Sequence, residues 1–169
     1  MCKCLDKYGP LLGRFLLTII FIIAGIGKMT DFSGTAAFMA SKEPLQLMDI
    51  FLNQHFAVIA SFMASKELSI VKVLLVFTIM IELGGALMIL VGWQARWAAA
   101  ALFFFVIVVT LIFHPFWSFE GHEAMQNFRD FFKNIAILGG LMYVMVHGSG
   151  PLSLGKDWCP GTGKCAASS

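Results

Sequence analysis

Ionisable side chains lie within or at the ends of the long apolar stretches of this sequence. Glu82 lies in the middle of one stretch, whereas Lys28 and His114 each close another. A carboxylate at the centre of a bilayer costs about 2.5–3.5 kcal/mol, so we expect Glu82 to face neighbouring helices. There it either stays charged by pairing with Lys28 or His114, or carries a proton in a dry pocket. A carboxylate, an imidazole and an amine in one apolar cavity could hold and transfer protons, which suits a quinone because its reduction takes up protons. Glu82, His114 and Lys28 are therefore the candidate catalytic residues.

Lys133 and Asn134 open the last apolar stretch. If the helices alternate in direction, both residues lie at the level of Lys28 and His114, near one surface of the membrane, with Glu82 about 16 Å deeper at about 1.5 Å per residue. A structural interpretation stays open beside the chemical one. Glu82 could hold the helices in register through a buried ion pair, and His114 could be an ordinary interfacial side chain.

The composition defines the class of protein. Of 169 residues, 59% are hydrophobic and 13% are charged, compared with about 45–50% and about 25% in soluble domains. Four apolar stretches are each long enough to cross a bilayer as a helix, and none alternates with the two-residue period of a strand. The sequence therefore predicts an all-α integral membrane four-helix bundle surrounded by lipid. The expected spans are residues 11–28, 70–92, 96–114 and 131–147.

A duplicated segment lengthens the loop at residues 30–68. Residues 37–43 recur in nearly the same order at 61–67, and the residues between the copies, 45–59, alternate apolar and polar side chains. This pattern predicts an amphipathic helix on the surface of the bilayer or of the bundle, because it is too polar to cross. After the last span the apolar periodicity ends, so we expect a loosely ordered tail at 148–169.

Four crossings put both chain ends on one face of the membrane. Lysine and arginine are equally numerous on the two faces, so the positive-inside rule does not decide the orientation, and we favour cytoplasmic ends. Arg14 lies about one turn into the first span on that face, where its long side chain is expected to extend to the lipid headgroups. The net charge of +2 is too small and too dispersed to indicate a nucleic-acid partner.

Four cysteines lie in the terminal segments, at Cys2, Cys4, Cys159 and Cys165. Their spacing differs from the usual C-x-x-C pattern of zinc sites, which makes them weak metal candidates, and we expect reduced, inert thiols. His114 and His147 are expected on opposite faces of the membrane, so they do not form a pair of axial haem ligands. No haem or metal is therefore expected.

Several motifs follow one another along the chain. They are Arg14 and Lys28 with Ala24-Gly25-Ile26 between them, Glu82-Leu83-Gly84-Gly85 followed by Gly92 and Arg96, His114-Pro115-Phe116-Trp117, and Lys133-Asn134 with Leu138-Gly139-Gly140. In these motifs and their order, residues 13–154 resemble the DoxX family of small four-helix membrane proteins. The resemblance implies a bacterial inner-membrane redox component, because members are described as the quinone-reducing subunit of a thiosulfate:quinone oxidoreductase or as part of a membrane oxidoreductase complex in thiol stress. It also implies Arg14, Lys133, Asn134 and Trp117 as substrate-binding residues.

Three functions follow from these patterns. In the first, the protein is a non-autonomous inner-membrane subunit of a quinone-linked or thiol-linked oxidoreductase, with quinone as its cofactor and a soluble or membrane redox protein as its partner. In the second, the same polar cavity carries a solute, although four spans without broken-helix pairs differ from a standard secondary transporter. In the third, the protein supports membrane assembly as a scaffold, and its buried charges are structural. A homo-oligomer is compatible with all three.

Overall fold

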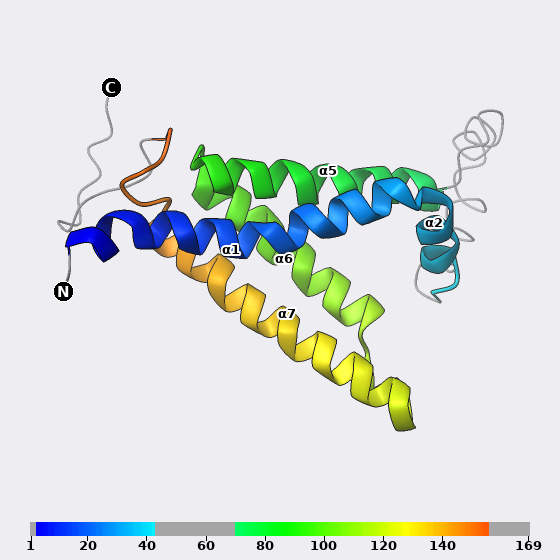
Figure 1. Ribbon diagram of the computed structural model, residues 1–169. Coiled ribbons are helices and arrows are strands. Elements are labelled where there is room, and N and C mark those ends of the chain that lie inside the picture. The colour runs from blue at the N-terminus through cyan, green and yellow to red at the C-terminus, as the bar shows by residue number, and fades with distance from the viewer. Residues whose placement is uncertain (1–2, 43–69, 156–169) are drawn as a thin grey trace. The chain divides into compact units, whose positions relative to one another are not determined.

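The computed structural model describes residues 3–42 and 70–155 of the chain. Its helices, in chain order, are α1 (Lys3–Thr30), α2 (Phe32–Ala40), α5 (Ile70–Val91), α6 (Ala95–Phe113), the 3-10 helix η1 (Phe116–Ser118) and α7 (Gly121–His147) (Figure 1). Among these residues there is no strand, which confirms the predicted all-α class. The amphipathic helix predicted at 45–59 lies outside the described residues.

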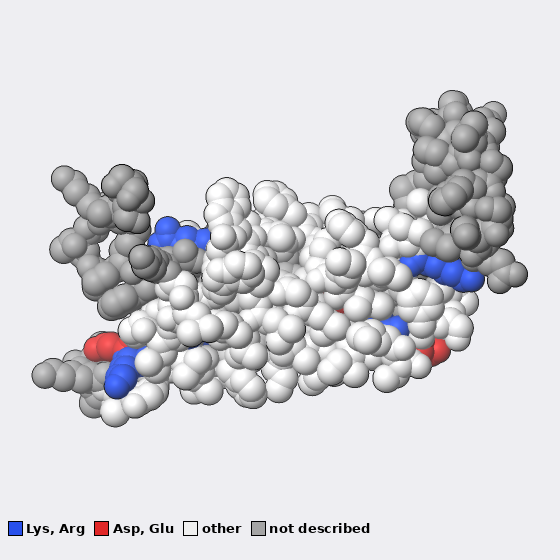
Figure 2. All heavy atoms as spheres, turned by 90° about the horizontal axis from the view of Figure 1, so that it is seen from above, with Lys and Arg blue, Asp and Glu red and all other residues white. Residues whose placement is uncertain are grey.

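Three helices of the described part are long and apolar enough to cross a membrane, at Asp6–Thr30, Ile70–Val91 and Ala95–Ser118. The face shown in Figure 2 carries few charged side chains, as expected of helices surrounded by lipid. α7 covers the predicted fourth span without a break, but it is not among the three. The fourth crossing therefore stays a prediction.

The chain divides into two compact units, each described by itself. The first comprises Met1–Ile22 and Ile81–Ser169, and the second comprises Ile23–Met80. In the second unit, the Asp31 carboxylate accepts a hydrogen bond from the Gly34 backbone N–H at 3.0 Å. This bond caps the N-terminus of α2 and lets a new helix start directly after α1 ends.

The core of the first unit is built around small side chains of α6. Buried residues recur along one face of that helix, at Ala95, Ala98, Ala99, Leu102, Val106 and Thr110. A Cβ built at Gly85 of α5 would lie 2.9 Å from Leu102 Cγ, and one built at Gly140 of α7 would lie 3.0 Å from Leu17 Cδ1 of α1. The helices of this unit therefore approach closely because glycine and alanine occupy their contacts.

α6 and α7 form an antiparallel hairpin (Figure 1). Pro115 follows α6 directly, and its missing N–H and fixed φ end the helix. Gly121, with a φ of 60°, then starts α7 in a left-handed conformation that suits glycine. The hairpin brings the last turns of α6, which contain Thr110, beside the first half of α7, where most of the polar residues of α7 lie.

The opposite end of the first unit is closed by residues 148–155. The Leu154 N–H donates to Val91 O at 3.2 Å, and the Gly155 N–H donates to Gly92 O at 2.9 Å. These bonds satisfy carbonyls that the end of α5 leaves without helical partners. Residues 148–155 thus contact the end of α5, residues 156–169 lie outside the described part, and the loosely ordered tail stays a prediction.

Candidate functional site

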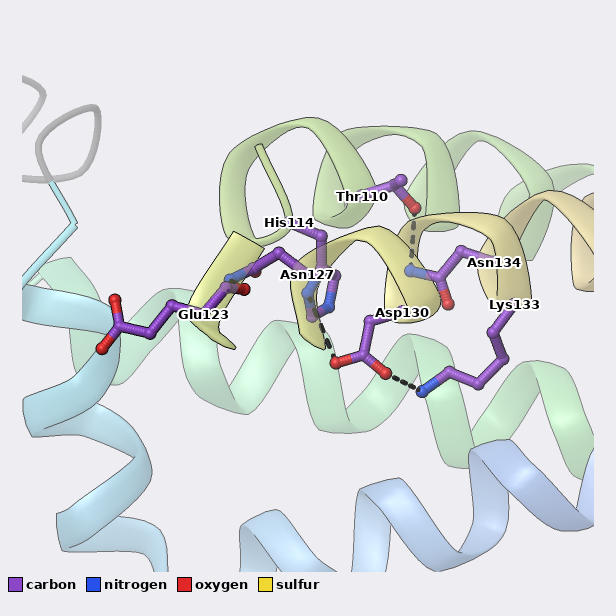
Figure 3. A network of polar contacts seen from close by, with 7 residues as sticks. All are labelled: Thr110, His114, Glu123, Asn127, Asp130, Lys133 and Asn134. Carbon is purple, nitrogen blue, oxygen red and sulfur yellow. Dashed lines mark hydrogen bonds and ion pairs between the residues drawn. The ribbon is translucent and has the colours of Figure 1, made fainter. Parts of the chain in front are cut away.

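A group of polar side chains lies at the end of the α6–α7 hairpin (Figure 3). His114 ends α6, and its backbone N–H donates to Thr110 O at 3.1 Å. Lys133 and Asn134 follow Asp130 by three and four residues on α7, so both are neighbours of Asp130 on the surface of that helix. The hairpin thus brings together His114, Lys133 and Asn134, three of the residues that the sequence singled out.

Asp130 makes the central contacts of this group. Its Oδ1 lies 2.8 Å from Lys133 Nζ, and its Oδ2 lies 3.9 Å from His114 Nδ1. The side chains of Asp130, Lys133 and His114 are 41%, 52% and 26% exposed, so the group is open on one side. Imidazole exchanges protons near neutral pH, and a carboxylate that faces one ring nitrogen orients the ring. At 3.9 Å the two groups are too far apart for a hydrogen bond, so a proton passes between them only when the side chains approach or a water bridges them.

A second layer of the group lies between the helices. Asn134 Nδ2 donates to Thr110 Oγ1 at 2.9 Å, and Thr110 Oγ1 in turn donates to Val106 O at 2.6 Å. Thr110 is buried, with 3% of its surface exposed. A hydrogen bond in so dry a position is specific in geometry, so it fixes how α7 sits against α6 and thereby where Asp130 faces His114.

Aromatic rings lie beside the polar group. The Phe116 N–H donates to His114 O at 2.9 Å, and the Phe116 ring contacts Trp117, Phe128 and Phe131 edge to face, at centroid distances of 5.2, 5.4 and 5.2 Å. Trp117 itself is 59% exposed. Such rings offer a flat apolar surface next to hydrogen-bond donors, which is the combination that small-molecule sites use.

The sequence reasoning missed Thr110 and Asp130. Asp130 lies just before the apolar stretch taken as the fourth span, and a buried threonine in an apolar run attracts no notice. A signal was nevertheless present, because Asp130 precedes Lys133 by three residues and Thr110 precedes His114 by four. Both spacings put the missed residue on the helix face of a residue that was predicted.

Glu82 lies in the middle of α5 and is 5% exposed. This burial agrees with the expectation that the carboxylate turns away from the lipid. Lys28 lies in the last turn of α1 and belongs to the second unit. Because the two units are described separately, the pairing of Lys28 with Glu82 stays a prediction, as do the catalytic roles of both residues.

Arg14 is buried in the first unit, with 2% of its surface exposed. Its Nη1 donates to Ile89 O at 3.3 Å, and its Nη2 donates to Leu152 O. These carbonyls belong to the last turn of α5 and to the segment after α7. The expectation that Arg14 extends outward to the headgroups is wrong, because acceptors at the end of α5 and in residues 148–155 bind the guanidinium inside the protein.

The cysteines contribute no metal site to the described part. Cys4 is exposed and its thiol is free. Cys2, Cys159 and Cys165 lie outside the described residues. Within residues 3–42 and 70–155, no group of three or more His, Cys, Asp or Glu side chains could hold a metal ion.

Long apolar helices with polar groups at their ends define this chain as a helical membrane protein. The DoxX family model matches residues 9–115, which include most of α1, α5 and α6. The chain belongs to the DoxX family. Since the match ends at Pro115, the α7 residues of the polar group lie beyond it.

Two proteins of Escherichia coli (strain K12) are similar to most of the chain. Inner membrane protein YphA is 27% identical over 146 residues, which are 86% of this chain and 87% of that protein. Inner membrane protein YqjF is 28% identical over 160 residues, 92% of this chain and 99% of that protein. The Surfeit locus protein 4 homolog of Schizosaccharomyces pombe is 33% identical over 69 residues, 40% of this chain and 23% of that protein. No solved structure matches the chain significantly.

Proposed function

We propose that this DoxX family protein is a membrane subunit of a redox complex and that the polar group around Asp130 binds a quinone and supplies protons for its reduction. The two Escherichia coli relatives are named inner membrane proteins, which supports a multi-pass location in a bacterial inner membrane. The proposal depends on one observation: Asp130 lies between His114 and Lys133, at 3.9 and 2.8 Å, beside exposed aromatic rings.

The chemistry needs both donors and a route to water. Reduction of a quinone to a quinol takes up two electrons and two protons, and in this proposal a soluble or membrane-bound redox protein supplies both electrons. His114 gives a proton to a carbonyl oxygen of the quinone and regains one through Asp130, which is 41% exposed to solvent. A second transfer by the same route completes the quinol. Lys133 donates a hydrogen bond that holds the ring in position, and the aromatic surface around Phe116 covers its apolar edge.

Substitutions at the polar group test the proposal with the full chain in lipid nanodiscs. His114→Ala and Asp130→Asn are compared with Glu123→Gln, which changes an exposed carboxylate on the same helix. The readout is binding of a short-tailed quinone by quenching of tryptophan fluorescence. Loss of a hydrogen bond to a charged group costs about 1.5–3 kcal/mol, so His114→Ala should weaken binding by about tenfold or more. Equal affinity in all three variants would sink the quinone proposal.

A second candidate function is a scaffold for a membrane complex. The internal hydrogen bonds of Arg14 favour it. Its guanidinium binds two backbone carbonyls inside the protein, so at least one charge of the first span has a structural contact. The two candidates differ in what His114→Ala does. A redox subunit should lose quinone reduction in membranes while it still co-purifies with its partner, whereas a scaffold should keep the redox activity of the membranes unchanged. Solute uptake that depends on His114 would instead support transport.

A further inference from the structure

A second cavity lies at the other end of the first unit, between the start of α1 and the end of α7. It has a volume of about 700 Å³, within the range of about 300–1,000 Å³ that ligand pockets occupy. Glycines hollow it out, and a Cβ built at Gly13 would meet nothing within 4 Å. We call it the α1–α7 cavity, and its apolar and small lining residues include Gly9, Gly13, Leu17, Gly140, Tyr143 and Val144.

The α1–α7 cavity lies where α1 begins and α7 ends. Arg14 lines it and also binds carbonyls of the last turn of α5 and of the segment that follows α7. Gly148, the first residue after α7, lines the cavity too. Helix ends in membrane proteins lie near the boundary between acyl chains and headgroups, so the cavity is expected to meet lipid headgroups.

Arg14 brings a buried positive charge to this cavity. It is 2% exposed, and its Nε is buried without a hydrogen-bond partner. Within the described residues, no carboxylate forms an ion pair with it. A buried cation that is balanced only by carbonyl dipoles is costly, and an anionic ligand would offset that cost. A neutral quinone would not, which separates this cavity from the Asp130 group.

Asp6 adds a negative charge to the same cavity. It lies two helical turns before Arg14, lines the cavity and is exposed. A ligand that fills the cavity therefore meets one cation in the interior and one carboxylate nearer the surface. A purely anionic headgroup would be repelled by Asp6, whereas a zwitterion would satisfy both charges.

We propose that the α1–α7 cavity binds a zwitterionic phospholipid with a primary ammonium headgroup. Its phosphate accepts from Arg14, its ammonium donates to Asp6, and one acyl chain lies along Leu17 and the groove beside Gly140. This assignment does not depend on the quinone proposal, because the cavity and the Asp130 group use different residues at opposite ends of the α6–α7 hairpin.

Lipid binding is measured by native mass spectrometry on the full chain, delipidated in detergent and then mixed with phosphatidylethanolamine, phosphatidylglycerol or phosphatidylcholine. Phosphatidylethanolamine should be retained about fivefold or more over the other two, which corresponds to about 1 kcal/mol. An excess of inorganic phosphate should not displace the lipid. The apolar walls of the cavity bind the acyl chain, and inorganic phosphate has no apolar part that could bind there. Equal retention of all three lipids, or displacement by phosphate, would overturn the assignment.

Two variants identify the cavity as the binding site. A Cβ at Gly13 would meet nothing within 4 Å, so Gly13→Leu can extend into the cavity, and it should lower phosphatidylethanolamine retention about tenfold. Gly139→Leu is the matched control, because its Cβ also meets nothing within 4 Å but the residue does not line the cavity. Unchanged retention in Gly13→Leu would exclude this cavity. Neither variant removes a contact of Arg14, so a folding defect at Arg14 cannot confuse the result.

The headgroup preference tests the role of Asp6. Asp6→Asn removes the repulsion of anionic headgroups and the acceptor for the ammonium, so phosphatidylglycerol should then bind at least as well as phosphatidylethanolamine. Glu123→Gln, an exposed carboxylate on α7 outside the cavity, should keep the original preference. If the preference survives in Asp6→Asn, the zwitterionic assignment is wrong.

Discussion

The charged side chains at the two ends of the α6–α7 hairpin differ in burial and in their partners. At the Arg14 end, a buried guanidinium donates to backbone carbonyls of Ile89 and Leu152. At the His114 end, Asp130 faces an imidazole and an ammonium, and all three side chains are between about a quarter and a half exposed. The first end fixes three chain segments together, whereas the second keeps its charges within reach of water. Charge near a span boundary is therefore buried and hydrogen-bonded at one end and partly exposed at the other.

The largest effect is expected at the Arg14 end. Arg14→Ala leaves Leu152 O without its donor, which costs about 1–3 kcal/mol, whereas Ile89 O keeps the Gly92 N–H as a donor at 3.1 Å. The packing of the buried arginine side chain is lost as well, so the free energy of unfolding should fall by about 2–5 kcal/mol. Unfolding in detergent, followed by circular dichroism, measures the change. Arg129→Ala on the exposed side of α7 is the control and should stay within about 0.5 kcal/mol. An equal loss in both variants would remove the contrast between the two ends.

A somewhat smaller effect is expected from Gly92→Ala. Gly92 has a φ of 77°, and a Cβ there would collide with Arg14 Nη1 and Ser153 Cβ. Strain of this kind costs about 1–3 kcal/mol. Gly84→Ala is the matched control, because Gly84 is helical and its Cβ would meet nothing within 4 Å, so it should be neutral or slightly stabilising. Thermal unfolding of both variants decides whether the turn is as tightly closed as these contacts imply.

At the His114 end, Thr110→Val should have a moderate effect on stability. The substitution keeps the side-chain volume but removes the acceptor of Asn134 Nδ2, at a cost of about 1 kcal/mol. Because this bond orients α7, quinone affinity should fall as well. Thr30→Val, at an exposed hydroxyl that bonds within its own helix turn, serves as the control. If quinone affinity were unchanged, the buried hydrogen bond would not position Asp130.

The smallest effect on stability is expected from Asp130→Asn. Ion pairs between partly exposed side chains contribute about 0–1 kcal/mol, so the unfolding free energy should change by less than about 1 kcal/mol. Quinone reduction in membranes should nevertheless drop, since the amide cannot relay a proton to His114. Arg14→Ala should therefore lower stability, whereas Asp130→Asn should lower quinone reduction. A stability loss as large as that of Arg14→Ala would contradict the division of roles.

Hydropathy and the alternation of helix direction are sufficient to predict much of the fold. They predicted the helices of α5 and α6 and the common level of His114, Lys133 and Asn134. They did not predict where α1 and α7 begin, because both helices extend through polar residues outside the apolar stretches. α1, for example, starts at Lys3 and runs through Pro10.

The buried hydrogen bonds of Arg14 could not be predicted from the local sequence. Its acceptors are backbone carbonyls, which every residue carries, and they lie 75 and 138 positions further along the chain. No pattern of side chains marks such acceptors. Asp130 differs in this respect, because its spacing to Lys133 is local and helical, and a reading that extended α7 by one turn would have included it.

The return of residues 148–155 to the end of α5 has a consequence for biosynthesis. Arg14 enters the membrane early, but its Leu152 acceptor is translated 138 residues later. Until then the nascent chain carries a guanidinium that lacks one of its final acceptors. A product that stops after α7 would keep this defect permanently, so it should be less stable than the full chain.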